Sequence, residues 1–428
     1  MDEVAAGVDE SRVRDAGPPA KGRWKLIGPG IVAAATGVGS GDLVATLIAG
    51  SRFGYALLWA AVIGCIVKIA LAEGSARYHL ATGSTMLDGW RSLGSWTSWY
   101  FGIYIMIWGF VYGATAMSAT ALPLAAFFPF LPLWAWAIIA GLSCATFVAF
   151  NRYEVFENTM KVCIGVMFVI VVGIAILVGP DVGAAFRGLI PTIPEGSAIY
   201  TLGLIGGVGG TITMASYGYW VSSKGWRTPQ WMGVMRLDNR VAYIVTGIFV
   251  VSMLIVGAEL LYSAQIALAT GDRGLLDLRE VLAERFGPAI ATLFLVGFFA
   301  TAVSSILGVW QGVSLLFADF VRNLRGGTGS REGLDRTPAF RFFLFWMTIP
   351  PMILLYFGRP FLLVVIYGAL GAFFMPFLAI TLIWLLNSKR VPAEWRSGWL
   401  SNGLLGIAAL LFIVLSISEI VGLFMGDA

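Results

Sequence analysis

Eleven long apolar segments constrain most strongly what this chain of 428 residues can fold into. Each is close to the roughly 20 residues that an α-helix needs to cross a bilayer. Backbone groups in lipid must pair within their own segment, and a helix achieves this. We therefore expect an all-α membrane protein with eleven transmembrane helices at approximately 26–50, 54–79, 97–123, 132–150, 161–179, 198–221, 240–267, 287–321, 340–358, 361–387 and 400–424.

Composition supports this class. The chain is 58% hydrophobic and only 12% charged, whereas a soluble chain carries about 25% charged residues. The net charge of +4 does not indicate a nucleic-acid partner, because the basic residues follow the predicted membrane topology. Residues 1–25 are polar and lack the apolar core of a signal peptide, so we expect a flexible cytoplasmic tail.

The basic residues also predict the orientation. With the N-terminus inside, the predicted cytoplasmic segments hold 20 Lys and Arg residues and the external segments 6, as the positive-inside rule requires. We expect a multi-pass plasma-membrane protein with a cytoplasmic N-terminus and, since the number of helices is odd, an extracytoplasmic C-terminus. Lys68 and Arg77 fall inside a predicted helix.

Two glycine clusters interrupt helices that would correspond in an inverted repeat of five helices. The first helix contains "TGVGSGD" (36–42), and the sixth has four glycines within 206–210. A single glycine is better explained by close helix packing. Two clusters at matching positions favour unwound segments, which secondary transporters use to bind substrates. This predicts a tail (1–25), two repeats (26–197 and 198–388) and a final segment (389–428).

Asp42 and Met214 lie at these clusters. An ionisable residue near the bilayer centre usually faces a partner, a cavity or a substrate, so Asp42 is either a ligand or an internal hydrogen-bonding residue. Met214 is either a packing residue or a soft ligand that favours transition metals. Asp319 lies toward a helix end, where a structural role is the simpler explanation.

The stretch "GPGIVAAATGVGSGDLVATLIAGSRFGYALLW" resembles the first helix of the Nramp family of divalent-metal transporters. The similarity continues through "LATG" at 80–83, "ATAVSSILGVWQG" in the eighth predicted helix and "MPF" at 375–377. It implies a LeuT-type fold of two inverted five-helix repeats and transport of a divalent metal ion.

The site motifs depart from that family. Its Asp-Pro-Gly-Asn signature aligns with residues 39–42, so one carboxylate is kept but shifted by three positions. Its Met-Pro-His motif aligns with 214–216, so the methionine stays and the histidine is lost. The resemblance implies a site with a net charge of −1 and six candidate metal-binding residues: the side chains of Asp42 and Met214, the carbonyls of Gly39 and Thr211, and a hydroxyl from Ser40 or Thr213.

These residues favour a transporter of Mn²⁺ or Fe²⁺, or of Mg²⁺ if Met214 points away. The family's proton route uses acidic residues in helix 3 and an arginine in helix 9. Here 97–123 has no acidic residue, and the position of the family's arginine falls near 343–345, which are apolar. We therefore expect no proton coupling of the family's kind.

The alternative function is a LeuT-fold transporter of an organic amine or amino acid. A receptor or scaffold would not need the paired breaks, and no motif indicates an enzyme or a resident cofactor. The expected partners are the metal ion and the bilayer, and the oligomeric state stays open.

Overall fold

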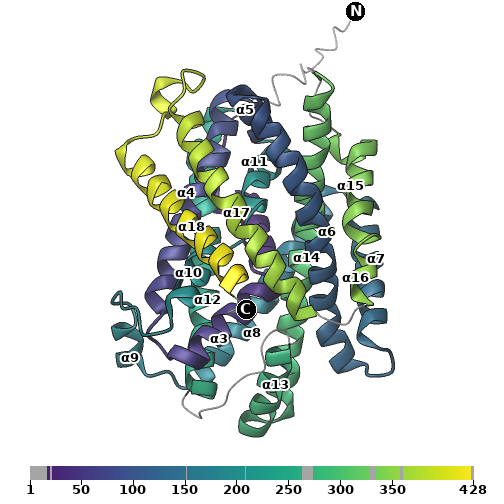
Figure 1. Ribbon diagram of the computed structural model, residues 1–428, viewed down its shortest axis with the longest axis vertical. Coiled ribbons are helices and arrows are strands. Elements are labelled where there is room, and N and C mark those ends of the chain that lie inside the picture. Colours follow the sequence, from purple (N-terminus) through teal and green to yellow (C-terminus); the bar gives the residue numbers. More distant parts are fainter. Residues whose placement is uncertain are drawn as a thin grey trace, which may run out of the picture.

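The computed structural model describes residues 17–19, 22–150, 152–207, 209–262, 273–327, 333–356 and 360–425, some of them, including 40–42 and 360–369, by their backbone alone. Within these ranges the chain forms helices joined by turns and contains no strand. The helices assemble into one elongated bundle (Figure 1). The all-α fold predicted from the apolar segments is confirmed.

Eight of the helical segments that the structure describes are long and apolar enough to cross a membrane. Four belong to the first half of the chain and four to the second. They are α4 (Leu58–Thr82), α6 (Ser95–Phe127), α7 (Leu133–Phe150), α8 (Tyr153–Leu177), α12 (Met232–Gly257) with the π-helical turn after it (Ala258–Tyr262), α14 (Pro288–Leu324), α15 (Pro338–Thr348) with α16 (Met352–Leu355), and α18 (Trp399–Met425).

Two of the three remaining predicted spans are interrupted helices. The span predicted at 26–50 consists of α2 (Pro29–Gly37) and α3 (Ser40–Phe53). The span predicted at 198–221 consists of α10 (Ala198–Gly207) and α11 (Thr213–Ser223). Both interruptions fall at the glycine clusters, as predicted. The third span is α17 (Pro360–Leu386).

Three predicted boundaries were wrong by about two helical turns or more. The fifth helix was expected to begin at 161, but α8 begins at Tyr153. The seventh helix was expected to begin at 240, but α12 begins at Met232. The charged residues before 240 were left out of the predicted span, yet Asp238 is fully buried there. The ninth was expected to run to 358, but α15 ends at Thr348, just before Pro350 and Pro351. Proline lacks the N–H that helix continuation requires.

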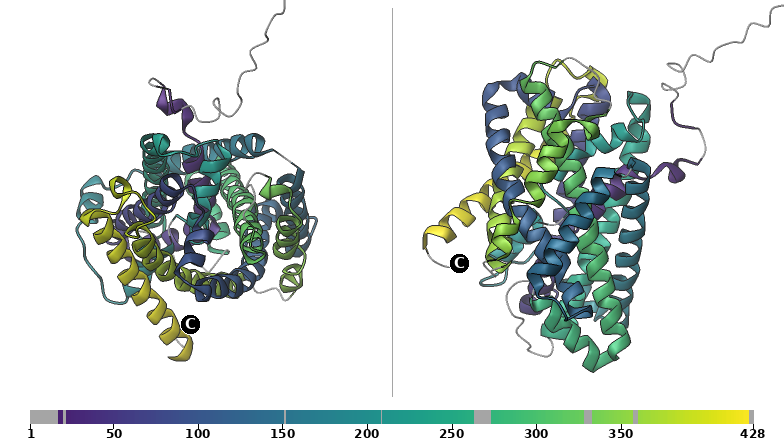
Figure 2. Two further views of the ribbon diagram at one scale, coloured as in Figure 1. Left: turned by 90° about the horizontal axis from the view of Figure 1, so that it is seen from above. Right: turned by 90° about the vertical axis from the view of Figure 1, so that its right-hand side faces the viewer.

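The inner halves of the two interrupted helices, α2 and α11, pack against each other in the interior. Helix α2 packs against α12, α14, α8 and α11, and α11 also packs against α4 and α14. Helix α18 lies at the periphery beside α17 (Figure 2). The short helices α5 (Met86–Leu93) and α13 (Arg273–Phe286) mark opposite ends of the bundle, which we call the α5 end and the α13 end (Figure 1).

Candidate functional site

The two helix breaks meet in the interior of the bundle. We call residues 37–39, at the junction of α2 and α3, the first break, and residues 209–212, directly before α11, the second break. A Cβ added to Gly37, at the end of α2, would lie 2.5 Å from both the carbonyl carbon and the carbonyl oxygen of Gly209. Only glycine at 37 permits this backbone-to-backbone approach.

The second break is built from glycines in left-handed conformation. Gly209 has φ 81° and Gly210 has φ 89°, a region that other residues rarely adopt. This conformation turns the carbonyls of both residues out of the helical path. The Tyr243 hydroxyl of α12 donates to the Gly209 carbonyl at 3.4 Å.

Helix α4 places a lysine against the same break. The Lys68 side chain has no solvent exposure, and its ammonium donates a hydrogen bond to the Gly210 carbonyl. The Lys68 Nζ atom also lies 5.4 Å from the centroid of the Phe412 ring. The net charge of −1 expected for the candidate ligands did not include this ammonium. A buried ionisable residue in the middle of an apolar helix is the signal that could have pointed to Lys68.

The first break is lined by hydroxyl groups from two other helices. The Ser305 hydroxyl of α14 donates to the Thr36 carbonyl, in the last turn of α2, at 3.2 Å. The Tyr112 hydroxyl of α6 lies 3.1 Å from the same Ser305 oxygen. A Cβ at Gly39 would lie 2.8 Å from that oxygen, so Ser305 contacts both sides of the break. Neither hydroxyl was among the predicted site residues.

Three of the six predicted ligands are buried at the second break and the start of α11: Thr211, Thr213 and Met214. The Thr213 hydroxyl oxygen would lie 2.7 Å from a Cβ on Gly210, so it adjoins the second break. The Thr211 side chain faces Gly371 of α17 instead. The Thr211 carbonyl accepts the Met214 N–H at 3.1 Å, which leaves one of its two lone pairs for another partner.

The other three predicted ligands belong to the first break. The Gly39 carbonyl accepts the Leu43 N–H at 3.2 Å and so begins α3. Ser40 and Asp42 lie in the first turn of α3, and their side chains lie outside what the structure describes. Among the described residues, no three His, Cys, Asp or Glu side chains are grouped closely enough to bind a metal ion.

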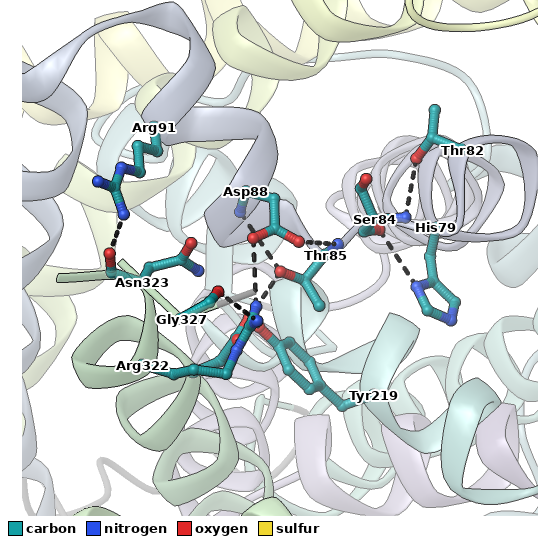
Figure 3. Close-up of polar contacts among 11 residues, drawn as sticks. His79, Thr82, Ser84, Thr85, Asp88, Arg91, Tyr219, Arg322, Asn323 and Gly327 are labelled. Atoms are coloured by element: carbon teal, nitrogen blue, oxygen red, sulfur yellow. Dashed lines mark hydrogen bonds and ion pairs between the residues drawn. The ribbon is translucent and has the colours of Figure 1, made fainter. Parts of the chain in front are cut away.

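A second polar cluster joins three elements at the α5 end (Figure 3). Asp319 of α14 has no solvent exposure. Its Oδ2 accepts the Tyr219 hydroxyl of α11 at 2.5 Å and the Thr85 hydroxyl before α5 at 2.6 Å. Its Oδ1 accepts from Arg322 Nε at 2.7 Å. One carboxylate therefore connects α5, α11 and α14.

Arg322 extends this cluster. It donates to Asp88 Oδ1 at 3.2 Å and to the Gly327 carbonyl at 3.0 Å (Figure 3). Thr85 and Asp88 form a capping box at the start of α5, which fixes both side chains. Asp88 therefore serves the helix cap and the ion pair together.

A cavity of about 1100 Å³ lies beside this cluster. Its walls come from α5, α11, α7, α8, α14 and α15 and include Tyr219, Arg322 and Gln311. The Gln311 side-chain oxygen accepts the Trp220 indole N–H at 2.6 Å. The cavity thus runs from the α5 end toward the helix that begins at the second break.

Asp238 of α12 anchors the first residues of α2. Its carboxylate accepts the Gly28 and Gly30 N–H groups at 2.9 and 2.5 Å, and the Tyr217 hydroxyl of α11 at 2.8 Å. The first N–H groups of a helix have no partner within it, and this buried carboxylate supplies one. The start of α2 and the middle of α11 are thereby tied to a single side chain.

Fold and site together define a polytopic helical membrane protein whose two interrupted helices cross in its interior, the arrangement by which secondary transporters bind substrates. The family model for natural resistance-associated macrophage protein-like (Nramp) chains matches residues 30–422. The chain belongs to the Nramp family.

The relatives agree with this assignment. The divalent metal cation transporter MntH of Chromohalobacter salexigens is 26% identical over 385 residues, which cover 83% of this chain and 87% of that protein. The metal transporter Nramp6 of Oryza sativa subsp. japonica is 25% identical, covering 100% of this chain and 82% of its own. These relatives are membrane transporters and not enzymes, as the sequence led us to expect for this chain.

A solved structure shares the fold. The manganese transporter of Eremococcus coleocola superposes with a TM-score of 0.79 at 17% sequence identity, over 95% of this chain and 90% of that one.

Proposed function

We propose that this protein carries a divalent metal ion across the plasma membrane by alternating access, with the ion bound transiently as substrate and with no resident cofactor. The crossing of the two breaks at Gly37, Gly209 and Gly210 carries the proposal, because unwound segments offer oxygen ligands in the membrane interior. The metal transporters among its relatives support the choice of substrate.

The proposed architecture has eleven transmembrane segments in a LeuT-type arrangement. The two interrupted helices and α17, added to the eight apolar helices, give this number. Residues 26–197 and 198–388 would form the inverted repeats, with 1–25 as a tail and 389–428 as the final segment. The N-terminus and the α5 end would face the cytoplasm, and the C-terminus the exterior.

The proposed metal site uses Asp42 and Met214 as side-chain ligands. The carbonyls of Gly39 and Thr211 would contribute oxygens, and Ser40 or Thr213 a hydroxyl. The burial of Met214 and Thr213 beside the second break supports this choice. A carboxylate, neutral oxygens and a thioether suit Mn²⁺ or Fe²⁺, whereas an oxygen-only site suits a partly hydrated Mg²⁺.

The polar cluster around Asp319 would be the cytoplasmic gate. It links α11, which begins at the second break, to α5 and α14. The neighbouring cavity would be the cytoplasmic vestibule through which the ion leaves. Separating α11 from α14 would require these hydrogen bonds to break.

Uptake by the purified protein in liposomes tests the function. We expect Mn²⁺ uptake by the wild type and at least a tenfold loss, about 1.4 kcal/mol of binding or transition-state energy, in Asp42→Ala and in Met214→Ala. Gly165→Ala is the matched control, because a Cβ at Gly165 meets no atom within 4 Å. Mg²⁺ uptake that needs Asp42 and not Met214 would instead indicate the oxygen-only site.

The Lys68 ammonium at the second break favours one second candidate, a substrate that carries a carboxylate, such as an amino acid. An ammonium that already donates to a backbone carbonyl can also pair with a carboxylate. Failure of both metal ions to bind or to be transported, together with uptake of an amino acid, would establish this candidate.

A further inference from the structure

Lys68 places a positive charge in direct contact with a backbone carbonyl of the second break. Its ammonium donates to the Gly210 carbonyl, and its side chain is fully buried. The Phe412 ring, 5.4 Å from Nζ, stabilises a cation at that point. Nζ is therefore held in an environment built for a cation.

The Gly210 carbonyl is also adjacent to the proposed metal ligands. The Thr213 hydroxyl adjoins Gly210, and the first break contacts it through Gly37, whose Cα would lie 3.1 Å from a Cβ at Gly210. The oxygen lone pairs that accept N–H donors are the same ones that coordinate metal ions. A lysine ammonium is a compact point charge on a flexible four-carbon chain, so it can leave and return without backbone movement.

We propose that the Lys68 ammonium is a tethered cation that occupies the cation position at the Gly210 carbonyl and that the transported ion must displace when it binds. This inference rests on the proposed function, because it names the competitor of the transported ion. Lys68 then lowers the affinity of the protein for the transported ion and speeds the release of that ion, since the ammonium returns to the Gly210 carbonyl as the metal leaves.

Two substitutions separate the charge of Lys68 from its hydrogen bond. Lys68→Met keeps the length of the side chain but removes both the charge and the donor. Lys68→Gln removes the charge and keeps an N–H donor. Lys161→Met is the control, because the Lys161 side chain is 36% exposed and pairs with Glu157 in α8, away from the breaks.

The first measurement is calorimetric titration of the purified full-length proteins with Mn²⁺, combined with uptake kinetics. Both Lys68 variants should bind Mn²⁺ at least tenfold more tightly than the wild type. They should also show a lower KM and a lower kcat, because the ion is held longer. Lys161→Met should match the wild type.

The second measurement does not depend on metal transport. Lys68→Ala opens a space beside the Gly210 carbonyl that a free small ammonium ion can fill. Methylammonium chloride should raise the Tm of Lys68→Ala and leave that of the wild type unchanged, whereas choline chloride at the same ionic strength should have no such effect. Equal responses of the two proteins would contradict a cation position at Gly210.

The outcomes separate the two proposals. If the wild type binds Mn²⁺ as tightly as both Lys68 variants, or more tightly, the tethered-cation proposal is overturned. The proposed function is unaffected by that result. A Lys68→Gln variant that behaves as the wild type while Lys68→Met differs shows a hydrogen-bond role only, and also overturns the tethered-cation proposal. Methylammonium rescue without Mn²⁺ binding in any variant supports the cation position and contradicts metal transport.

Discussion

At the scale of single residues, the crossing of the breaks depends on the absence of side chains. The three nearest atoms that a Cβ on Gly37 would meet are backbone atoms of Gly209 and Gly210, at 2.5 to 2.9 Å. No rotamer change can relieve such an overlap, because the atoms in the way belong to the backbone and not to a side chain. Residue 37 therefore fixes the distance between the two interrupted helices.

We expect Gly37→Ala to destabilise the protein by about 1–3 kcal/mol, the usual cost of overpacking, and to abolish uptake. The two interrupted helices would have to move apart and their ligands with them. A thermal unfolding scan in detergent and the liposome assay measure the two effects. The Gly165→Ala control should unfold at or above the wild-type temperature, since a glycine in an open helix position costs stability. Full uptake by Gly37→Ala would show that the breaks need not touch.

Single-residue prediction from sequence succeeded where local patterns were sufficient. The glycine clusters located both breaks, and Met214 and Thr213 lie beside the second one. Lys68 and Ser305 were missed because each acts across the fold, on Gly210 at a separation of 142 residues and on Thr36 at 269. No local pattern specifies such a pairing before the helices have packed.

At the scale of helices, Asp319 connects α5, α11 and α14 through hydrogen bonds. Its position near a helix end indicated only a structural role, but its carboxylate accepts hydrogen bonds from residues that belong to α11, α14 and the cap of α5. The same lesson applies to α12. Its charged first turns were left out of the predicted span, whereas Asp238 is buried there and accepts hydrogen bonds from the N–H groups of Gly28 and Gly30.

We expect Asp319→Asn to loosen the α5 end. Asparagine offers a single acceptor oxygen to the three donors, and each buried donor left unpaired costs about 1–3 kcal/mol. Maleimide labelling of Leu315→Cys, a buried residue of the cavity wall, should become several-fold faster when Asp319→Asn is present. The test uses a protein whose three native cysteines are replaced by alanine.

Glu394→Gln is the control for this labelling experiment, because Glu394 is exposed in the turn before α18. It removes the same charge without touching the cluster, so the labelling rate should not change. Unchanged labelling in Asp319→Asn would mean that the remaining bonds, above all Arg322 to Asp88, keep this end closed.

At the scale of the whole molecule, the packing between α6 and α15 bears on whether protons accompany the substrate. Residues 95–127 of α6 contain no Asp, Glu, His, Lys or Arg. On the facing helix, Phe343 is fully buried and stacks on Phe317 of α14, with ring centroids 4.5 Å apart. A Cβ at Gly109 of α6 would lie 2.9 Å from the Phe343 ring. Aromatic carbon fills this interface, and carbon cannot relay protons.

We therefore expect metal uptake without coupled proton entry. In liposomes, an inward gradient of about one pH unit, worth about 1.4 kcal/mol per proton, should change the initial rate of Mn²⁺ uptake by less than about twofold. A pH-sensitive dye inside the liposomes should report no metal-dependent acidification. The membrane potential must be clamped with potassium and valinomycin, because the ion itself carries charge and its entry would otherwise drive passive proton movement. Metal-dependent acidification under the clamp would require a proton route elsewhere, and the buried charges at the α5 end, Asp319 and Asp238, would be the first to test by substitution.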